Sequence, residues 1–194
     1  MSQSTKAKIA RSAESLFLTQ GYEAASLNDL VARAGVSKGA FFHYYPNKQA
    51  IIIDILDSYA QTQLLTPLDK HMSGARTLKS GLLAWLEEGY SAAANGKFKG
   101  GCLLGNFALE LSDRDEAVRE HIKQLFLQWE NQFVGYFKPA QAEGKLLMEP
   151  RQFARLIIAM MEGITMMGKV HKDHIRASRE FQALAELIER MVKD

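Results

Sequence analysis

Apolar side chains recur every three or four positions along almost the whole chain, which is the spacing of one face of an α-helix. The first such stripe is formed by Ile9, Ala13, Leu16 and Phe17, in a helix expected over residues 6–20. No segment shows the alternation of apolar and polar residues that is typical of a strand. The pattern therefore predicts an all-α protein.

Two short helices joined by a tight turn are expected next. Ser26 is suited to be a helix N-cap, and Asp29 three residues later completes a capping box with it. Gly35 is expected to end this helix, because a residue without a Cβ adopts the left-handed conformation without steric cost. Ser37 caps the helix that follows. Such a pair forms a helix-turn-helix, whose second helix fits the major groove of DNA.

The exposed face of the second short helix carries residues suited to DNA. Lys38 is expected to bond a guanine edge or a phosphate, and the small Ala40 to touch a thymine methyl group. Lys48 begins the next helix, where neighbouring N–H groups also favour a phosphate. For both lysines the alternative is a solvated surface position. The predicted DNA-binding residues are Ser26, Ser37, Lys38, Gly39, Ala40, His43, Tyr44 and Lys48, whereas Phe41 and Tyr45 are expected to complete the small core.

The charge distribution agrees with this interpretation. The formal net charge of +2 is modest, but residues 1–50 hold six basic and three acidic residues. The rest of the chain holds 18 basic and 19 acidic residues. The positive excess thus lies where phosphates would be met, and because it is small, tight binding should need two half-sites.

Composition also indicates the cellular compartment in which the protein is expected. No run approaches the roughly 18 consecutive apolar residues of a membrane span, and the N-terminus lacks the apolar core of a signal peptide. The single cysteine, Cys102, excludes an intrachain disulfide. We therefore expect a cytoplasmic protein with no membrane partner.

The remainder of the chain is also expected to be helical. Pro139 is expected to end one long helix, and Pro150 suits the first turn of the next. The helices expected here cover residues 47–70, 77–95, 102–111, 113–137, 150–170 and 178–192. With the three N-terminal helices this makes about nine. It also predicts a helix-turn-helix DNA-binding domain over residues 1–47 and a larger effector-binding and dimerisation domain over residues 48–194.

The order of short sequence elements between about residues 5 and 52 closely resembles the TetR family of transcriptional regulators. These elements are Gly21-Tyr22-Glu23, Ala25-Ser26-Leu27, Ala34-Gly35-Val36-Ser37-Lys38-Gly39 and His43-Tyr44-Tyr45-Pro46-Asn47-Lys48. The resemblance implies a one-component repressor, not an enzyme, that binds a palindromic operator in double-stranded DNA as a homodimer. The family usually has Tyr at the position of Phe42, with its hydroxyl on a phosphate, and that role passes here to Tyr44.

Two apolar stripes near the C-terminus bear on assembly. They consist of Phe153, Leu156, Ile157, Met160, Met161 and Ile164, and of Leu184, Leu187, Ile188 and Met191. The resemblance implies that these last two helices pair with their symmetry mates in a four-helix bundle. A twofold dimer would then place two helix-turn-helix units about one DNA turn apart, ~34–36 Å. The alternative is that both stripes only fill the core of the monomer.

Large apolar residues in the middle of the chain are candidates for lining an effector pocket. This set contains Trp85, Tyr90, Phe98, Phe107, Trp129, Phe133, Met160, Met161, Met166 and Met167. Methionine adapts to irregular space, which suits a tolerant site for a small apolar effector. Such a ligand would have to prefer the conformation in which the DNA-binding units are mis-spaced. The alternative is that these residues are ordinary core.

Cys102 is the other candidate sensor. It stands where a helix is expected to begin, and N–H groups there and the nearby Lys97 and Lys99 favour the thiolate. Its Gly-Cys-Leu segment resembles that of a subset of TetR-family repressors, some of which respond to electrophiles or oxidants through this cysteine. An electrophilic effector would then weaken operator binding by modifying Cys102. The alternative is a small buried apolar residue.

No cofactor, metal site or catalytic group is expected. His171 and His174 have a spacing compatible with a metal, but no cysteine or clear acidic partner completes the set. The alternative function is a helical small-molecule-binding protein or an enzyme without operator-specific DNA binding. Such a protein has no reason to place Lys38, His43 and Tyr44 along one exposed helical face.

Overall fold

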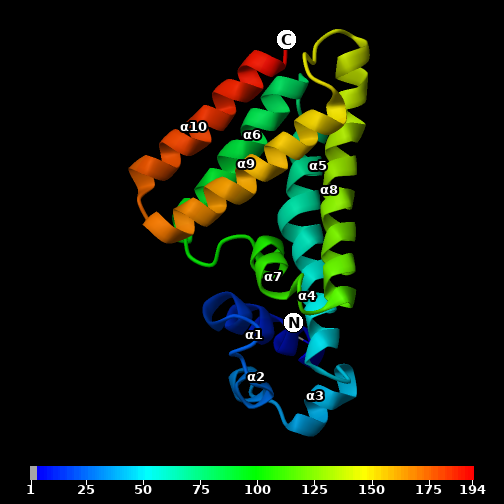
Figure 1. Cartoon of the computed structure of the whole chain (residues 1–194), viewed down its shortest axis with the longest axis vertical. Coiled ribbons are helices and arrows are strands. Elements are labelled where there is room, and N and C mark those ends of the chain that lie inside the picture. The colour runs from blue at the N-terminus through cyan, green and yellow to red at the C-terminus, as the bar shows by residue number, and fades with distance from the viewer. Residues whose placement is uncertain (1–3) are drawn as a thin grey trace. The chain divides into compact units, whose positions relative to one another are not determined.

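The computed structural model describes residues 4–194, and Figure 1 shows the helices in chain order. Over this range the chain forms α-helices and one π-helix, with no strand, which confirms the all-α prediction. The elements are α1 (Thr5–Gln20), α2 (Leu27–Ala34), α3 (Lys38–Tyr44), α4 (Lys48–Tyr59), η1 (Ala60–Leu65), α5 (Thr66–Ser73), α6 (Leu78–Asn95), α7 (Leu103–Leu111), α8 (Glu116–Ala142), α9 (Pro150–His171) and α10 (His174–Met191). None of these helices is both long and apolar enough to cross a bilayer.

The expected caps are present at the N-terminal helices. The Ser26 hydroxyl accepts from the Asp29 N–H at 3.1 Å, while the Asp29 carboxylate accepts from the Ser26 N–H at 3.2 Å. Gly35 has a φ of 60°, and Ser37 caps α3 through a 3.1 Å bond from the N–H of Ala40. Each bond joins residues three apart, so the sequence alone was sufficient to predict it.

The helix expected over residues 47–70 is continuous from α4 through η1 to α5, and it extends to Ser73. Its middle segment, η1, widens into a π-helix just before Pro67, the residue that lacks an N–H for the helical ladder. The side-chain amide of Gln132 donates to the Leu65 carbonyl at 2.9 Å. A side chain of α8 thus satisfies a backbone acceptor at the end of the wider turn.

Two expected helix boundaries lie four or five residues from the observed ones. Helix α8 runs through Pro139 to Ala142, because the buried Phe137 and Ala140 on either side offset the lost backbone hydrogen bond. Helix α10 begins at His174, four residues earlier than expected, since the Asp173 side chain caps it by accepting from the N–H groups of residues 175 and 176.

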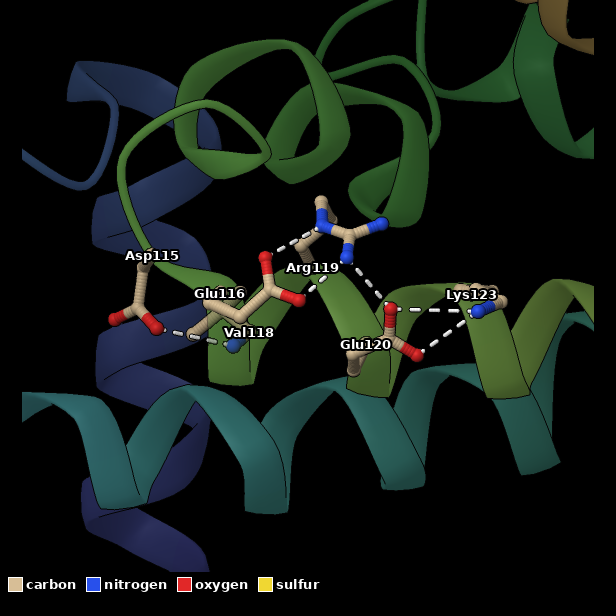
Figure 2. A network of polar contacts seen from close by, with 6 residues as sticks. All are labelled: Asp115, Glu116, Val118, Arg119, Glu120 and Lys123. Atoms are coloured by element: carbon tan, nitrogen blue, oxygen red, sulfur yellow. Dashed lines mark hydrogen bonds and ion pairs between the residues drawn. The ribbon is translucent and has the colours of Figure 1, made fainter.

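The start of α8 also differs from the expected one at residue 113. Figure 2 shows that Asp115 is the capping residue, accepting from the Val118 N–H at 3.1 Å. Arg119 lies between two glutamates: its Nε donates to Glu116 Oε2 at 2.9 Å, and a terminal guanidinium nitrogen lies 2.7 Å from Glu120 Oε1. These ion pairs are solvent-exposed, so they orient side chains more than they stabilise the fold.

The chain divides into two compact units. The first joins the residues up to Ala60 with Leu103–Leu125, and the second joins Gln61–Cys102 with Phe126–Asp194. In the first unit the predicted α1 stripe is buried, and Phe17 packs edge-to-face on Phe107 with ring centroids 5.8 Å apart. The compact unit that contains the helix-turn-helix therefore also includes α7.

The second unit is organised around aromatic side chains of α8. Phe133 packs on Trp85 at 5.3 Å, on Trp129 at 5.9 Å and on Phe137 at 5.6 Å between ring centroids. Phe137 in turn packs on Phe153 of α9 at 5.2 Å. All five are buried, so this ladder forms the core that joins α6, α8 and α9.

A buried carboxylate ties α8 to α9. Glu130 is 7% exposed and bonds the guanidinium groups of Arg151 and Arg155, the latter at 2.9 Å. Burial raises the pKa of Glu130, but the two arginines outweigh this effect and hold it below its usual value. The carboxylate is therefore ionised at neutral pH and anchors the first turns of α9.

Candidate DNA-binding face and regulatory sites

The buried side of helix α3 is packed through two aromatic residues, one within the helix and one directly after it. Phe41 is fully buried and Tyr45 is 3% exposed, which confirms that both belong to the core. The Tyr45 hydroxyl donates to Asp54 of α4 at 2.6 Å, and Lys6 of α1 donates to the same carboxylate at 2.7 Å. Burial and then Asp54 raise the pKa of Tyr45, so its hydroxyl stays a donor. This network fixes the C-terminal end of α3.

The opposite side of α3 faces solvent. Lys38, Gly39, His43 and Tyr44 are exposed, and Ala40 is half-buried; we call these five residues the α3 contact face. The rings of His43 and Tyr44 pack edge-to-face with centroids 4.8 Å apart. The structure thus brings together the residues of α3 that the sequence singled out for DNA contact.

The three other candidate DNA-binding residues already have local roles. Ser26 and Ser37 use their hydroxyl groups as helix caps. The Lys48 ammonium donates to the Tyr22 carbonyl and lies 3.9 Å from the centroid of its ring. Burial lowers the pKa of Lys48, although Glu23 and Glu110 partly oppose this. A phosphate contact by any of the three remains a prediction.

The candidate effector residues are distributed over both units. Trp85, Trp129 and Phe133 pack on one another, while Phe107 packs on Phe17 in the first unit. Met160 and Met161 are half-buried on α9. The Trp129 indole N–H is buried and has no hydrogen-bond partner within residues 4–194. The tryptophan and phenylalanine residues of this set therefore lie in packed cores.

Tyr90 is the member of the set that lines a cavity between α6 and α10. This cavity has a volume of about 280 Å³. Its lining consists of Leu83, Leu86, Glu87, Tyr90, Ser178, Phe181, Gln182 and Ala185. Sequence reasoning missed Phe181, which also lines a second cavity of about 70 Å³ with Phe98 and Gly101. Phe181 lies three residues before Leu184, so extending the apolar stripe of α10 by one step would have found it.

Cys102 is half-buried and directly precedes α7. Its thiol is hydrogen-bonded to the carboxyl group of Glu162 on α9. Burial raises the pKa of Glu162, and the bond to Cys102 only partly reverses the shift. The site therefore pairs a thiol with a carboxyl group that is more basic than usual.

Comparison with known proteins shows the family of the chain. Residues 9–55 match the family described as "Bacterial regulatory proteins, tetR family", and residues 79–184 match "Tetracyclin repressor-like, C-terminal domain". The chain belongs to the TetR family. This TetR-family chain is 30% identical over 175 residues to an uncharacterized HTH-type transcriptional regulator of Lactococcus lactis, covering 88% of this chain and 86% of that one.

Two further proteins resemble this TetR-family regulator, one in sequence and one in structure. The HTH-type transcriptional repressor NemR of Escherichia coli is 24% identical over 177 residues, covering 87% of this chain and 86% of NemR. A crystal structure of a TetR transcriptional regulator from Chloroflexus aurantiacus superposes with a TM-score of 0.85 at 23% identity, over 97% of this chain and 96% of that one. The structural match confirms the fold of a TetR-family protein along nearly its whole length.

Proposed function

We propose that this TetR-family regulator is a repressor that binds a palindromic operator as a homodimer. The observation that carries the proposal is the exposed α3 contact face on a helix anchored by Phe41 and Tyr45. A rigid helix with a cationic and aromatic outer side is suited to the major groove. A small-molecule-binding protein without DNA recognition gains nothing from this arrangement.

The dimer is supported by apolar residues at the end of α9 and the start of α10. Much of the two predicted stripes is used inside the monomer, since Phe153 and Leu184 are fully buried. In contrast, Met166, Val170 and Ile175 are 51%, 68% and 67% exposed. Large apolar side chains gathered on one end of a helix pair favour contact with a second copy.

Lys38→Ala tests the DNA-binding role. We expect the wild type to bind DNA from its own upstream region tightly, selectively and as two chains per duplex, with a steep salt dependence. Loss of the lysine should weaken this binding about tenfold, and a smaller salt slope would assign the contact to a phosphate. Fluorescence anisotropy over a salt series measures both effects.

Lys138→Ala is the matched control, because it removes the same charge from an exposed position on α8. Its affinity should remain within about twofold of the wild type. Equal weak binding of the wild type to every DNA, or sedimentation as a monomer at micromolar concentration, would contradict the proposed function.

The release signal is proposed to act on the second unit. The cavity between α6 and α10 is lined mainly by apolar side chains and suits a small apolar effector. Cys102 offers a second route, because the neighbouring Glu162 can accept the thiol proton when an electrophile is attacked. For the E. coli relative NemR, the solved structure is described as the reduced form. The structure of this relative is thus distinguished by its redox state.

Alkylation with N-ethylmaleimide tests the cysteine route. The sulfur of Cys102 adds to the carbon–carbon double bond of the maleimide, and the proton ends on the neighbouring carbon. We expect treated wild type to lose at least about tenfold in operator affinity, because the adduct must be accommodated at the half-buried start of α7. The Cys102→Ser variant, which the reagent cannot alkylate there, should keep its affinity. An equal loss in both proteins would exclude Cys102 as the sensor.

A further inference from the structure

One carboxylate of α7 holds the turn between α1 and α2. Glu110 accepts hydrogen bonds from the backbone N–H groups of Tyr22 at 3.0 Å and Glu23 at 2.8 Å. The partners are 87 and 88 residues apart in the sequence. Hydrogen bonds to an ionised acceptor are stronger than neutral ones, so this pair is a firm connection between α7 and the turn.

Apolar contacts reinforce the same connection. Phe107 lies three residues before Glu110 on α7, and its ring packs on that of Phe17 in α1. The ring centroids of Phe107 and Tyr22 are 6.3 Å apart. Gly21 leaves room for the carboxylate, because a Cβ there would lie 3.3 Å from Glu110 Oε1. The close approach of α7 to this turn is therefore supported by a polar contact, an aromatic contact and a glycine.

Tyr22 also connects the two ends of the helix-turn-helix. Its carbonyl accepts from Lys48 at the start of α4, and its ring lies under the same ammonium group. Tyr22 precedes α2 and Lys48 follows α3, so this contact closes the chain segment that carries both helices. Glu110 of α7 binds the backbone of the same Tyr22. We call Tyr22, Glu23, Lys48, Phe107 and Glu110 the Tyr22 cluster.

We propose that Glu110 is a positioning residue for DNA recognition, through which α7 sets the orientation of α3. The inference rests on the proposed operator binding by a homodimer. Glu110 is not proposed to touch DNA. It fixes Tyr22, which binds Lys48 at the end of the helix-turn-helix, to α7. Without this hold, α3 can take more orientations, and a dimer then tolerates half-sites at more than one spacing.

The test compares Glu110→Gln with the wild type. The amide group keeps the size of the side chain but replaces one acceptor oxygen by a donor, so one of the two backbone bonds is lost. The probes are a duplex selected by the wild type from a random-sequence pool and a second duplex with its half-sites one base pair further apart. We expect the wild type to prefer the selected spacing, and the variant to lose about tenfold in affinity for that duplex. The ratio between the two duplexes should fall by about threefold or more.

Glu120→Gln is the matched control, because it removes the same charge from an exposed ion pair of α8. Hydrogen exchange of the Tyr22 and Glu23 amides should accelerate in Glu110→Gln and not in the control. Glu110→Asp keeps the carboxylate with a shorter reach, and it serves as the second variant if the glutamine variant unfolds.

Two results would overturn the role of Glu110. One is equal weakening on both duplexes, which is the effect of a merely structural contact. The other is a spacing preference in the Glu110 variants that matches the Glu120→Gln control. A wild type that selects no duplex at all would instead refute the proposed function, and with it this inference.

Discussion

Phe41→Ala is expected to lower the free energy of unfolding of the helix-turn-helix unit by about 3–5 kcal/mol. Phe41 is the one residue of the seven-residue α3 that is fully buried. Its ring packs on those of Phe42 at 5.5 Å and Tyr45 at 5.7 Å between centroids. Removing it leaves a cavity under a helix too short to be stable without packing, so α3 should lose its fixed position.

Urea unfolding followed by circular dichroism measures this loss, and operator affinity should fall with it. Phe42→Ala is the control at the adjacent position, where the side chain is 50% exposed. It should cost less than about 1 kcal/mol, because little apolar area is returned to water. Similar losses in the two variants would show that Phe41 does not anchor α3.

Gly21→Ala is expected to destabilise the same unit by about 1–3 kcal/mol. Gly21 has a φ of 83° and a ψ of 165°, a backbone region that is essentially restricted to glycine. The added Cβ would also approach the Glu110 carboxylate, so the turn and the Tyr22 cluster are disturbed together. Thermal unfolding should show a lower Tm, and operator affinity should fall as in Glu110→Gln.

Gly135→Ala provides a control of opposite sign. Gly135 is exposed within α8, and a Cβ there would meet nothing within 4 Å. Alanine is the better helix former, so this variant should gain about 0.5–1 kcal/mol. If both glycine variants shifted stability in the same direction, the strained turn at Gly21 would not be the cause.

Much of the fold was predictable because its signals are local. The capping box of Ser26 and Asp29, the left-handed Gly35 and the cap at Ser37 all join residues at most four positions apart. The apolar stripe of α1 follows the same short period. Separately, the order of short sequence elements between about residues 5 and 52 resembles the TetR family, and the comparisons confirm that family.

The starts of α8 and α10 were misplaced because the local caps Asp115 and Asp173 were overlooked, whereas the other errors came where burial overrode a local signal. Pro139 is a helix breaker by itself, yet the buried residues beside it keep α8 intact. The mid-chain aromatic residues have the composition of a pocket, but whether a ring lines a cavity or packs on another ring depends on helices far apart in the sequence. Trp85 and Phe133 pack together, whereas Tyr90 lines the cavity with Phe181.

Helical periodicity and caps act within one or two turns, so the amino-acid order was sufficient to predict the helix-turn-helix, the all-α class and the α3 contact face. The partners of Glu110, Lys48 and Glu162, in contrast, are known only from the folded structure. A single charged residue on a helix carries no sign of which distant N–H, carbonyl or thiol it will meet. That choice is made when the helices pack, because buried polar groups must then find partners from whichever elements the core brings together.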